Sequence, residues 1–399
     1  MKFFIKILIV FAIIASCKNH GSLDKSQIKT FDLTKKADIS SIKLSDLDFI
    51  DIEYIPLETC EDNSIGHFDI RAVTHRFIAD NNFFIIKRFN DILLFQTDGS
   101  FVSRIGTVGR GPEEYEVAHD IDIDQTGYLY LVSGFQEKFN LYSENGKFIR
   151  SFKSPFQGPV QFRLSEDKII CYVDNLQGNS ENSFIITDTL GLVLKAFPNN
   201  YPFKPYKGIP TGIGRENLFY NFNNRLYIKE VYSDTIYNFD KMLFKPHMVL
   251  ATGDRLLTPE ARAQFDLSYL SENYIRPIHL FEFGDFVYYE YTYSFKLGTK
   301  NILYAFIGSK TTEFQAFIDA DQGLINDLDG GPPFIPKTIK DNKTVISWID
   351  ANKLKEYVAS ENFKNSKPLY PEKKKELEKL ADSLKETNNP VLVMVRLKH

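Results

Sequence analysis

The sequence of 399 residues predicts an all-β fold, and three observations support this class. The first is composition: 35 Phe and 21 Tyr bring the aromatic content to 14%, and these side chains suit pleated sheets better than helices. The second is a recurring turn in which Gly99, Gly146 and Gly191 interrupt apolar runs at spacings of 47 and 45 residues. The third is a set of six strand-forming runs that accompany these turns along the chain.

Each recurring turn predicts a β-hairpin. The dipeptides at 98–99 and 145–146 pair Asp or Asn with Gly, which favours a type I′ turn because both of its central residues need positive φ. A third copy spans residues 185–197, and weaker copies follow at 240–241 and 309–311.

The six strand-forming runs indicate the number of repeats. We interpret them as the inner strands of six sheets: Phe83–Ile86, Tyr128–Val132, Lys168–Val173, Asn224–Ile228, Asp285–Tyr289 and Thr344–Ile349. Four short strands in a repeat of about 40–50 residues are typical of a β-propeller blade, and radial packing of blades buries faces that a single sheet would expose. The sequence therefore predicts a six-bladed β-propeller over residues 45–399.

The two ends of this region predict how the ring closes. Residues 50–57 alternate between apolar and polar and end near a proline, and residues 391–397 form an apolar strand. We expect the two to pair within the sixth blade, with the N-terminal strand at its outer edge, because closure removes exposed sheet edges.

Two helical insertions interrupt the strand pattern, at about 258–270 and 371–387. Thr258, Pro259 and Glu260 are the N-cap, first-position proline and first-turn acid of the former. In the latter, Leu377, Leu380 and Leu384 share one face, and glutamates interleave with the lysines of 373–375, which favours a solvated surface over a membrane contact.

The N-terminus predicts export and lipid attachment. Lys2 and Lys6 precede a short apolar stretch at 7–14, followed by small residues and Cys17, as in a lipoprotein signal peptide over residues 1–16. The alternative is an ordinary secretion signal with a chance cysteine. Residues 17–44 are polar and are interpreted as a tether, with Cys17 as the lipid attachment site.

The charge and the cysteine content argue against nucleic-acid binding and against a fold that depends on disulfides. With 48 basic and 52 acidic residues, the net charge of −4 gives no reason to expect nucleic acid as a partner. Beyond Cys17, Cys60 and Cys171 could pair in an oxidising compartment, but a chain of this length does not need the crosslink, and we expect two buried free thiols.

One loop carries a family resemblance. The segment Arg104-Ile105-Gly106-Thr107-Val108-Gly109-Arg110-Gly111-Pro112-Glu113-Glu114-Tyr115 resembles the G-x-G-R-G-P-x-E-Y signature of six-bladed β-propeller lipoproteins of Bacteroidetes. The end of the chain, from Asn389-Pro390 to Leu397-Lys398, is similar to the ending of that family, and the blades are similar to NHL repeats. The resemblance implies the fold and the lipid anchor but no activity.

The same loop supplies the candidate ligand-binding residues Arg110, Glu113 and Tyr115, because loops between blades are where propellers usually hold ligands. A nucleotide-binding reading of the glycines is disfavoured, since their spacing departs from G-x-G-x-x-G and Pro112 stands where a helix should begin.

We assign no catalytic residue, no cofactor and no metal site. Asp120, Asp122 and Asp124 resemble the start of a calcium loop, but Gln125 and Leu131 replace the required Gly and Glu, and the alternation with Ile favours a strand. Acids at positions 319, 321, 327 and 329 are interpreted as a loop, and the aromatic run at 281–295 as packing between blades.

The sequence thus predicts a monomeric, lipid-anchored binding module of the cell envelope, on the periplasmic face of the outer membrane, that recognises a glycan fragment or a protein partner. The alternative from another class is a hydrolase or lyase with its site at the mouth of the propeller channel. A third possibility is a structural subunit docked on an outer-membrane complex. Each rests on fold analogy.

Overall fold

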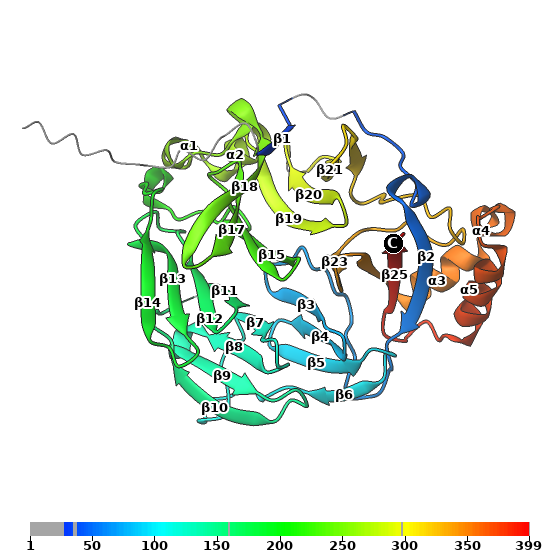
Figure 1. Ribbon diagram of the computed structural model, residues 1–399, viewed down its shortest axis with the longest axis horizontal. Helices are drawn as coiled ribbons and strands as arrows, with labels where there is room; N and C mark the ends of the chain where they lie inside the picture. Colours follow the sequence, from blue (N-terminus) through cyan, green and yellow to red (C-terminus); the bar gives the residue numbers. More distant parts are fainter. Residues whose placement is uncertain (1–27, 35–37, 159, 297, 399) are drawn as a thin grey trace, which may run out of the picture.

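A computed structural model describes residues 28–34, 38–158, 160–296 and 298–398. The expected signal peptide and Cys17 lie outside the described residues. Six sheets surround a common axis, which confirms the predicted all-β, six-bladed propeller (Figure 1). Among the described residues, no helix is both long and apolar enough to span a membrane.

The first three blades follow one another along the chain and have four antiparallel strands each. Blade 1 contains β3 (His75–Ala79), β4 (Phe83–Arg88), β5 (Asp91–Gln96) and β6 (Phe101–Arg104). Blade 2 contains β7 (Asp120–Ile123), β8 (Leu129–Ser133), β9 (Lys138–Tyr142) and β10 (Phe148–Lys153). Blade 3 contains β11 (Val160–Ser165), β12 (Lys168–Val173), β13 (Asn182–Asp188) and β14 (Val193–Pro198).

Among the other three blades, blade 4 includes a strand from the N-terminal region, and blade 6 includes strands from both ends of the chain. Blade 4 contains β15 (Asn217–Phe222), β16 (Arg225–Glu230), β17 (Thr235–Asp240), β18 (Leu243–Ala251) and, at its edge, β1 (Lys29–Asp32). Blade 5 contains β19 (Arg276–Phe283), β20 (Phe286–Thr292), β21 (Tyr304–Ser309) and β22 (Gln315–Asp319). Blade 6 contains β23 (Thr338–Ile339), β24 (Thr344–Ile349), β25 (Val391–Leu397) and β2 (Phe49–Pro56).

The expected inner strands are second in their blades rather than innermost. The six predicted runs correspond to β4, β8, β12, β16, β20 and β24, and a further strand, from β3 to β23, precedes each of them nearer the axis. The reason is burial: β8 is buried at every position and so reads as a continuous apolar run. The innermost β7 contains Asp120 and Asp122, which interrupt its apolar residues and hide the strand in a search for apolar runs.

The recurring glycines are the turns between third and fourth strands. Gly99, Gly146 and Gly191 have φ of +91°, +80° and +88°. A Cβ added to Gly99 would lie 2.2 Å from the carbonyl oxygen of Pro56, and one added to Gly191 would lie 2.4 Å from that of Lys153. Both carbonyls belong to the outer strand of the preceding blade, so the repeat reflects close approach as well as turn conformation.

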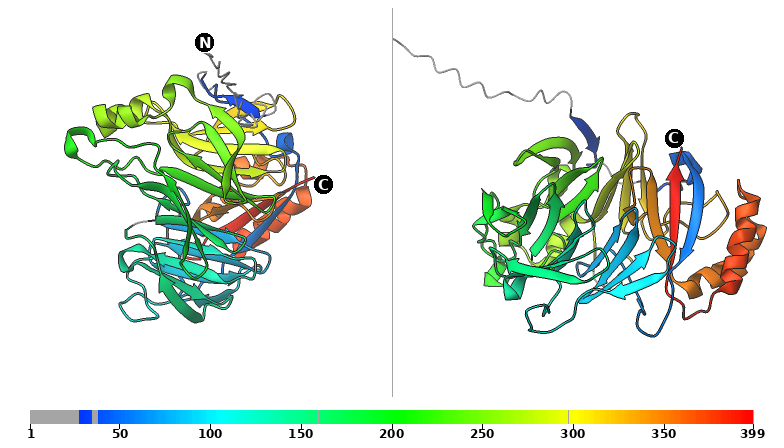
Figure 2. Two further views of the ribbon diagram at one scale, coloured as in Figure 1. Left: turned by 60° about the vertical axis from the view of Figure 1, so that its left-hand side comes forward. Right: turned by 60° about the horizontal axis from the view of Figure 1, so that its bottom comes forward.

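The two ends of the chain meet in blade 6. β2 pairs antiparallel with β25, with Ile52 opposite Val395 and Tyr54 opposite Val393, and forms the outer edge of that sheet. Figure 2 shows the two strands side by side.

Part of the expected tether instead packs on the propeller. β1 runs parallel to β18, and Phe31 and Leu33 are buried. Further along, Ile39 bridges to Phe317 of blade 5, and the 3₁₀ helix η2 (Ser45–Leu47) leads into β2. We call the described residues of 28–48 the N-terminal strap. Its isolated apolar side chains are too few to stand out from a polar sequence.

Helices occupy two connections on one face of the ring. Between β18 and β19, a helix predicted over 258–270 is two helices, α1 (Pro259–Gln264) and α2 (Leu267–Asn273), because Asp266 accepts a hydrogen bond from the N–H of Tyr269 and starts the second one. Between β24 and β25 lie α3 (Ala351–Ala359), α4 (Glu361–Asn365) and α5 (Pro371–Ser383). Short 3₁₀ helices lie between β8 and β9 (η3, Gly134–Gln136), between β14 and β15 (η4, Tyr206–Gly208) and between β18 and α1 (η5, Gly253–Arg255).

The aromatic run of blade 5 is core, as expected. Tyr288, Tyr289 and Tyr291 are buried, and they pack with other rings of blades 4 and 5. Both cysteines described are free, but only Cys171 is buried; Cys60, expected to be buried, is exposed in the loop after β2.

Candidate functional site

The loop that carries the predicted ligand-binding residues joins β6 to β7. Tyr115 is 1% exposed, and its hydroxyl donates to the backbone carbonyls of Asn90 at 2.8 Å and Ile105 at 3.3 Å. The carboxylate of Glu114 accepts a hydrogen bond from the N–H of Gly111 at 2.8 Å. These contacts fold the loop upon itself and upon blade 1.

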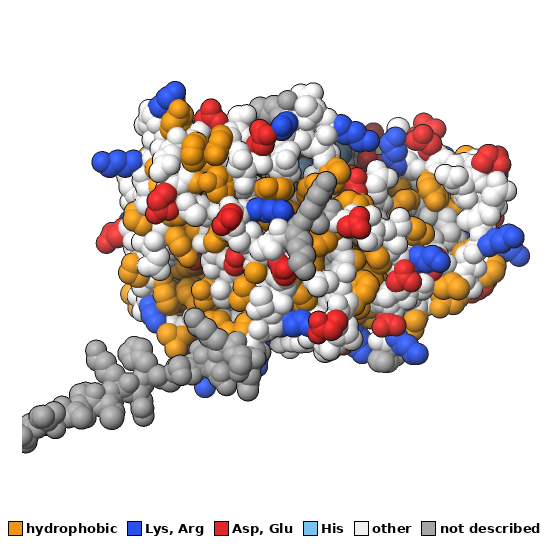
Figure 3. Space-filling view, turned by 90° about the horizontal axis from the view of Figure 1, so that it is seen from above, with side chains coloured by type: hydrophobic (Ala, Val, Ile, Leu, Met, Phe, Trp, Pro, Cys, Tyr) orange, Lys and Arg blue, Asp and Glu red, His pale blue; other side chains and the backbone are white. Residues whose placement is uncertain are grey.

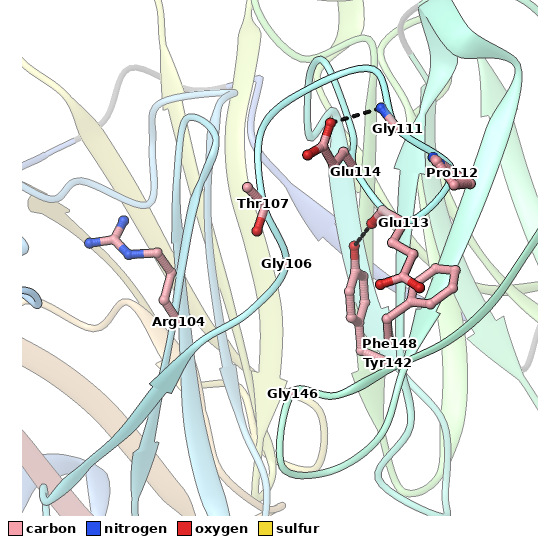
Figure 4. A pocket seen from close by; sticks show the side chains of 10 residues that line it. All are labelled: Arg104, Gly106, Thr107, Gly111, Pro112, Glu113, Glu114, Tyr142, Gly146 and Phe148. Atoms are coloured by element: carbon pink, nitrogen blue, oxygen red, sulfur yellow. Dashed lines mark hydrogen bonds between the residues drawn. The ribbon is translucent and has the colours of Figure 1, made fainter.

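Glu113 and Arg110 lie apart from Tyr115. Glu113 lines a hollow of about 500 Å³ at the outer rim between blades 1 and 2, which we call the rim pocket (Figure 4). Arg110 is exposed and pairs with Glu116, with Nε 2.6 Å from the carboxylate. The structure thus brings only one of the three predicted residues to the rim pocket.

A second hollow lies on the propeller axis and draws on all six blades. This channel mouth has a volume of about 370 Å³ and is lined by residues of β3, β7, β11, β15, β19 and β23. It opens at the turns between first and second strands, where Asp80, Gln125, Glu166, Asn224 and Asn342 lie. The helical connections leave from the opposite face, because successive strands in each blade are antiparallel.

A smaller cavity, which we call the throat, adjoins the mouth. The throat has a volume of about 30 Å³ and shares Arg76, Phe219, His279 and Leu280 with the mouth. Its other lining residues are Ile70, His75, Gln161, Arg163, Arg215 and Leu218.

Two carboxylates of β7, Asp120 and Asp122, lie beside arginines of the throat. Asp120 accepts hydrogen bonds from Arg163 Nη1 at 2.7 Å and from the N–H of Phe162 at 3.1 Å. Asp122 accepts from the N–H of Leu164 at 2.8 Å, and Arg76 Nη2 lies 3.8 Å from its other oxygen. These acids therefore belong to a strand and its ion pairs.

The guanidinium groups of the throat are incompletely satisfied. Arg215 Nη2 donates to the carbonyls of Ile70 and Ala72 at 2.8 and 3.0 Å. Within the described part of the chain, however, the Nε atoms of Arg76, Arg163 and Arg215 are buried without a hydrogen-bond partner. Buried polar atoms in proteins are normally paired, so three such donors around one cavity require an explanation.

Burial and mutual repulsion shift the pKa values of these groups. Burial, reinforced by the nearby Arg163, lowers the pKa of Arg76 and that of Arg215 to about 10. Burial raises the pKa of Asp122 above its usual value, whereas for Asp120 the guanidiniums outweigh burial and lower the pKa. Burial also lowers the pKa of His279 to about 3, so its ring is neutral at pH 7.

The other acidic stretch is engaged in structural contacts. Asp321 pairs with Arg71, Asp327 accepts from the hydroxyl of Ser45, and Asp329 accepts from the side chain of Asn326. Across residues 28–34, 38–158, 160–296 and 298–398, no three His, Cys, Asp or Glu side chains lie together in a way that could hold a metal ion.

Sequence reasoning missed the throat arginines. Arg76 lies on β3, Arg163 on β11 and Arg215 in the connection before β15, so no window of sequence contains two of them. A usable signal was Arg163 between the apolar residues Phe162 and Leu164 of a strand, because a charged residue buried in a strand needs a partner.

Comparisons with known proteins place the chain in a family. The model of the family "Domain of unknown function (DUF4934)" matches residues 28–396, and the chain belongs to this family. The fold is similar to the "Putative exported protein" of Bacteroides fragilis NCTC 9343, with a TM-score of 0.64, 16% identity and coverage of 93% of this chain and 100% of that one. A DUF4221 member from Bacteroides vulgatus ATCC 8482 matches with a TM-score of 0.47, 12% identity and coverage of 88% and 97%. No curated protein is significantly similar in sequence.

Proposed function

We propose that this member of the DUF4934 family is a binding module of the cell envelope whose ligand, a glycan fragment, enters the channel mouth. The observation that carries the proposal is the convergence of all six innermost strands on one cavity of about 370 Å³. This volume falls within the range of about 300–1,000 Å³ common for small-ligand sites.

The chemistry of the mouth favours a glycan over a protein partner. Amide side chains gather at its rim, from Gln125, Asn221, Asn223, Asn224 and Asn342. Each amide can both donate and accept hydrogen bonds, which suits the hydroxyl groups of sugars. A folded protein partner would need a broad surface, whereas this cavity is enclosed by six strands.

The proposed location is outside the cytoplasm, with lipid attachment at Cys17 and residence on the periplasmic face of the outer membrane. The Bacteroides fragilis protein of similar fold carries the description "exported", which supports this location.

On the side of the molecule seen in Figure 3, acidic and basic side chains are scattered among hydrophobic ones.

The alternative function, a hydrolase or lyase at the channel mouth, is favoured by one observation. Asp120 and Asp122 lie two residues apart on β7, and their pKa values are shifted in opposite directions. Such divergence is found in acid–base pairs of enzymes. Incubation of any glycan that binds, followed by mass spectrometry of the products, distinguishes turnover from binding.

The proposal is tested by blocking each hollow in turn in the chain that starts at residue 18. Ser165→Trp would fill the channel mouth, and Thr107→Trp is the matched control in the rim pocket. We expect oligosaccharides to raise the melting temperature of the unmodified chain by a few degrees at about one hundred times Kd. Ser165→Trp should abolish this rise and Thr107→Trp should keep it. The reverse pattern, or no rise with any oligosaccharide, would overturn the proposal.

A further inference from the structure

We infer that the throat is a binding site for one carboxylate group, and that the glycan at the mouth is an acidic one whose uronate carboxylate reaches the three arginines. The inference rests on the proposed function for the identity of the carrier. The carboxylate site itself rests on the throat alone.

The first argument is the balance of hydrogen-bond donors and acceptors. Arg76, Arg163 and Arg215 each have a buried Nε–H without a partner in the described chain. Arg163 is 4% exposed, so bulk water does not supply the missing acceptor. An ionised carboxylate has no hydrogens and about four lone-pair sites, so a single carboxylate can accept from all three donors.

The second argument is charge. Arg76, Arg163, Arg215 and the buried Lys87 form a cluster of four cations, while Asp120 and Asp122 on β7 and Asp69 near Arg215 are the facing carboxylates. One positive charge is left over when all are ionised. His75 and His279 also line the throat, and burial lowers the pKa of both, so they add no positive charge at neutral pH.

The third argument is size. A cavity needs about 10–15 Å³ of this volume for one water molecule, and the throat has about 30 Å³. This space suits the two oxygens of a carboxylate and is small for the four oxygens of a sulfate or phosphate. The phenyl ring of Phe219, over which the Arg163 guanidinium lies at 5.3 Å, forms part of the wall.

The fourth argument is access. Arg76, Phe219, His279 and Leu280 line both the throat and the mouth, so the two spaces adjoin one another at these residues. A sugar ring held among the amides of the mouth can therefore direct a carboxylate inward. Arginine suits this role because its planar fork matches the geometry of a carboxylate.

The experiment has two parts, both on the chain from residue 18. In the first, melting temperatures are measured in sodium acetate and in sodium chloride of equal ionic strength. In the second, isothermal titration calorimetry compares trigalacturonate with the neutral galactose trisaccharide. The variants are Arg215→Gln and Arg163→Lys, which keeps the charge beside Asp120 but lacks an Nε–H. The control is Arg396→Gln, at an exposed position of β25 that lines neither the mouth nor the throat.

We expect acetate to give a saturable rise of about 2 °C or more in the unmodified chain and in Arg396→Gln. We expect trigalacturonate to bind at least about tenfold more tightly than the neutral sugar. Arg215→Gln and Arg163→Lys should lose both effects, and either variant suffices if the other fails to fold.

The outcomes separate the two proposals. Equal binding of acidic and neutral sugars without an acetate effect would overturn the carboxylate site and leave the proposed function standing. An acetate effect without binding of either sugar would support the site and overturn the glycan-binding function. An acetate effect that chloride reproduces, or that persists in both throat variants, would overturn the site.

Discussion

The rim pocket and the channel differ in how their polar groups are used. In the rim loop, Glu114 binds the backbone of its own loop, Tyr115 ties that loop to blade 1, and Arg110 pairs with Glu116 at the surface. In the channel, Arg76, Arg163 and Arg215 come from separate blades and retain buried donors. The motif beside the rim hollow therefore maintains a local fold. A sequence motif confined to one loop can thus reflect the needs of that loop, whereas a site assembled from many strands leaves no motif.

The largest expected effect comes from removing β2. The channel needs six blades in a closed ring, while the rim pocket needs only blades 1 and 2. If the pairing of β2 with β25 closes the ring, deletion of residues 48–58 should unfold the whole domain, because it exposes the apolar strand β25. Near-ultraviolet circular dichroism and thermal melts measure this loss. A deletion variant that melts cooperatively within a few degrees of the parent would show that closure does not depend on these residues.

The next prediction compares the loss of an ion pair in the channel with the loss of one in the rim loop. Asp120→Ala leaves Arg163 buried without its carboxylate and should cost about 3–5 kcal/mol. Glu116→Ala removes the partner of Arg110, whose side chain is 89% exposed, and should cost less than about 1 kcal/mol. Urea unfolding monitored by fluorescence gives both values. Similar costs for the two variants would contradict the distinction drawn between channel and rim.

A smaller effect tests the role of Tyr115 in the rim loop. Tyr115→Phe removes a hydroxyl that donates to the carbonyl of Asn90 and should cost about 1–2 kcal/mol of stability. The hypothesis that Arg110, Glu113 and Tyr115 bind a ligand predicts an additional loss of binding. We expect stability to fall and oligosaccharide affinity to stay the same. Glu113→Gln, which alters an exposed lining residue, is the control, and weaker binding in both variants would move the site to the rim.

The smallest effect is a pH dependence that arises from the channel wall. Burial lowers the pKa of Lys87 to about 8 in the folded protein, below the value of about 10.4 in an unfolded chain. Between pH 8 and 10 the unfolded state therefore binds more protons, and stability should rise with pH. Between pH 8 and 9, Lys87→Met should reduce this rise by about 1 kcal/mol. Urea midpoints at pH 7, 8, 9 and 10 provide the measurement, and an unchanged slope would mean that Lys87 does not titrate in this range.

Much of the fold could be predicted because its signals are local. Second strands such as β8 are buried on both faces, and turn glycines such as Gly99 need positive φ. Both features depend on neighbours in sequence. The helix α3 was not predicted, although Asp350 at its N-cap is a residue type that favours helix starts; in the structure this side chain makes no capping bond.

The channel could not be predicted from the sequence for a different reason. All six innermost strands contribute to its wall, which mixes charged, polar and apolar side chains, so the lining has no single pattern along the sequence. The sequence offered Asp120 and Asp122 as a calcium hypothesis, but their partner Arg163 lies 43 residues from Asp120, a distance at which no pattern reveals the pairing. Only the radial arrangement of blades brings these groups together.

The N-terminal strap also decides where a mechanical load would enter the molecule. The described chain begins at residue 28, and β1 joins the outer edge of blade 4 through a pairing of four residues with β18. A pull from the N-terminal side acts on this short pairing and on Phe31 and Leu33 before it can reach β2. Optical-tweezers unfolding should show peeling of residues 28–48 as an early extension of about 70 Å, at roughly 3.3–3.6 Å per residue. The N-terminal strap would detach before the ring unfolds, so that a protein pulled at this end keeps its channel intact.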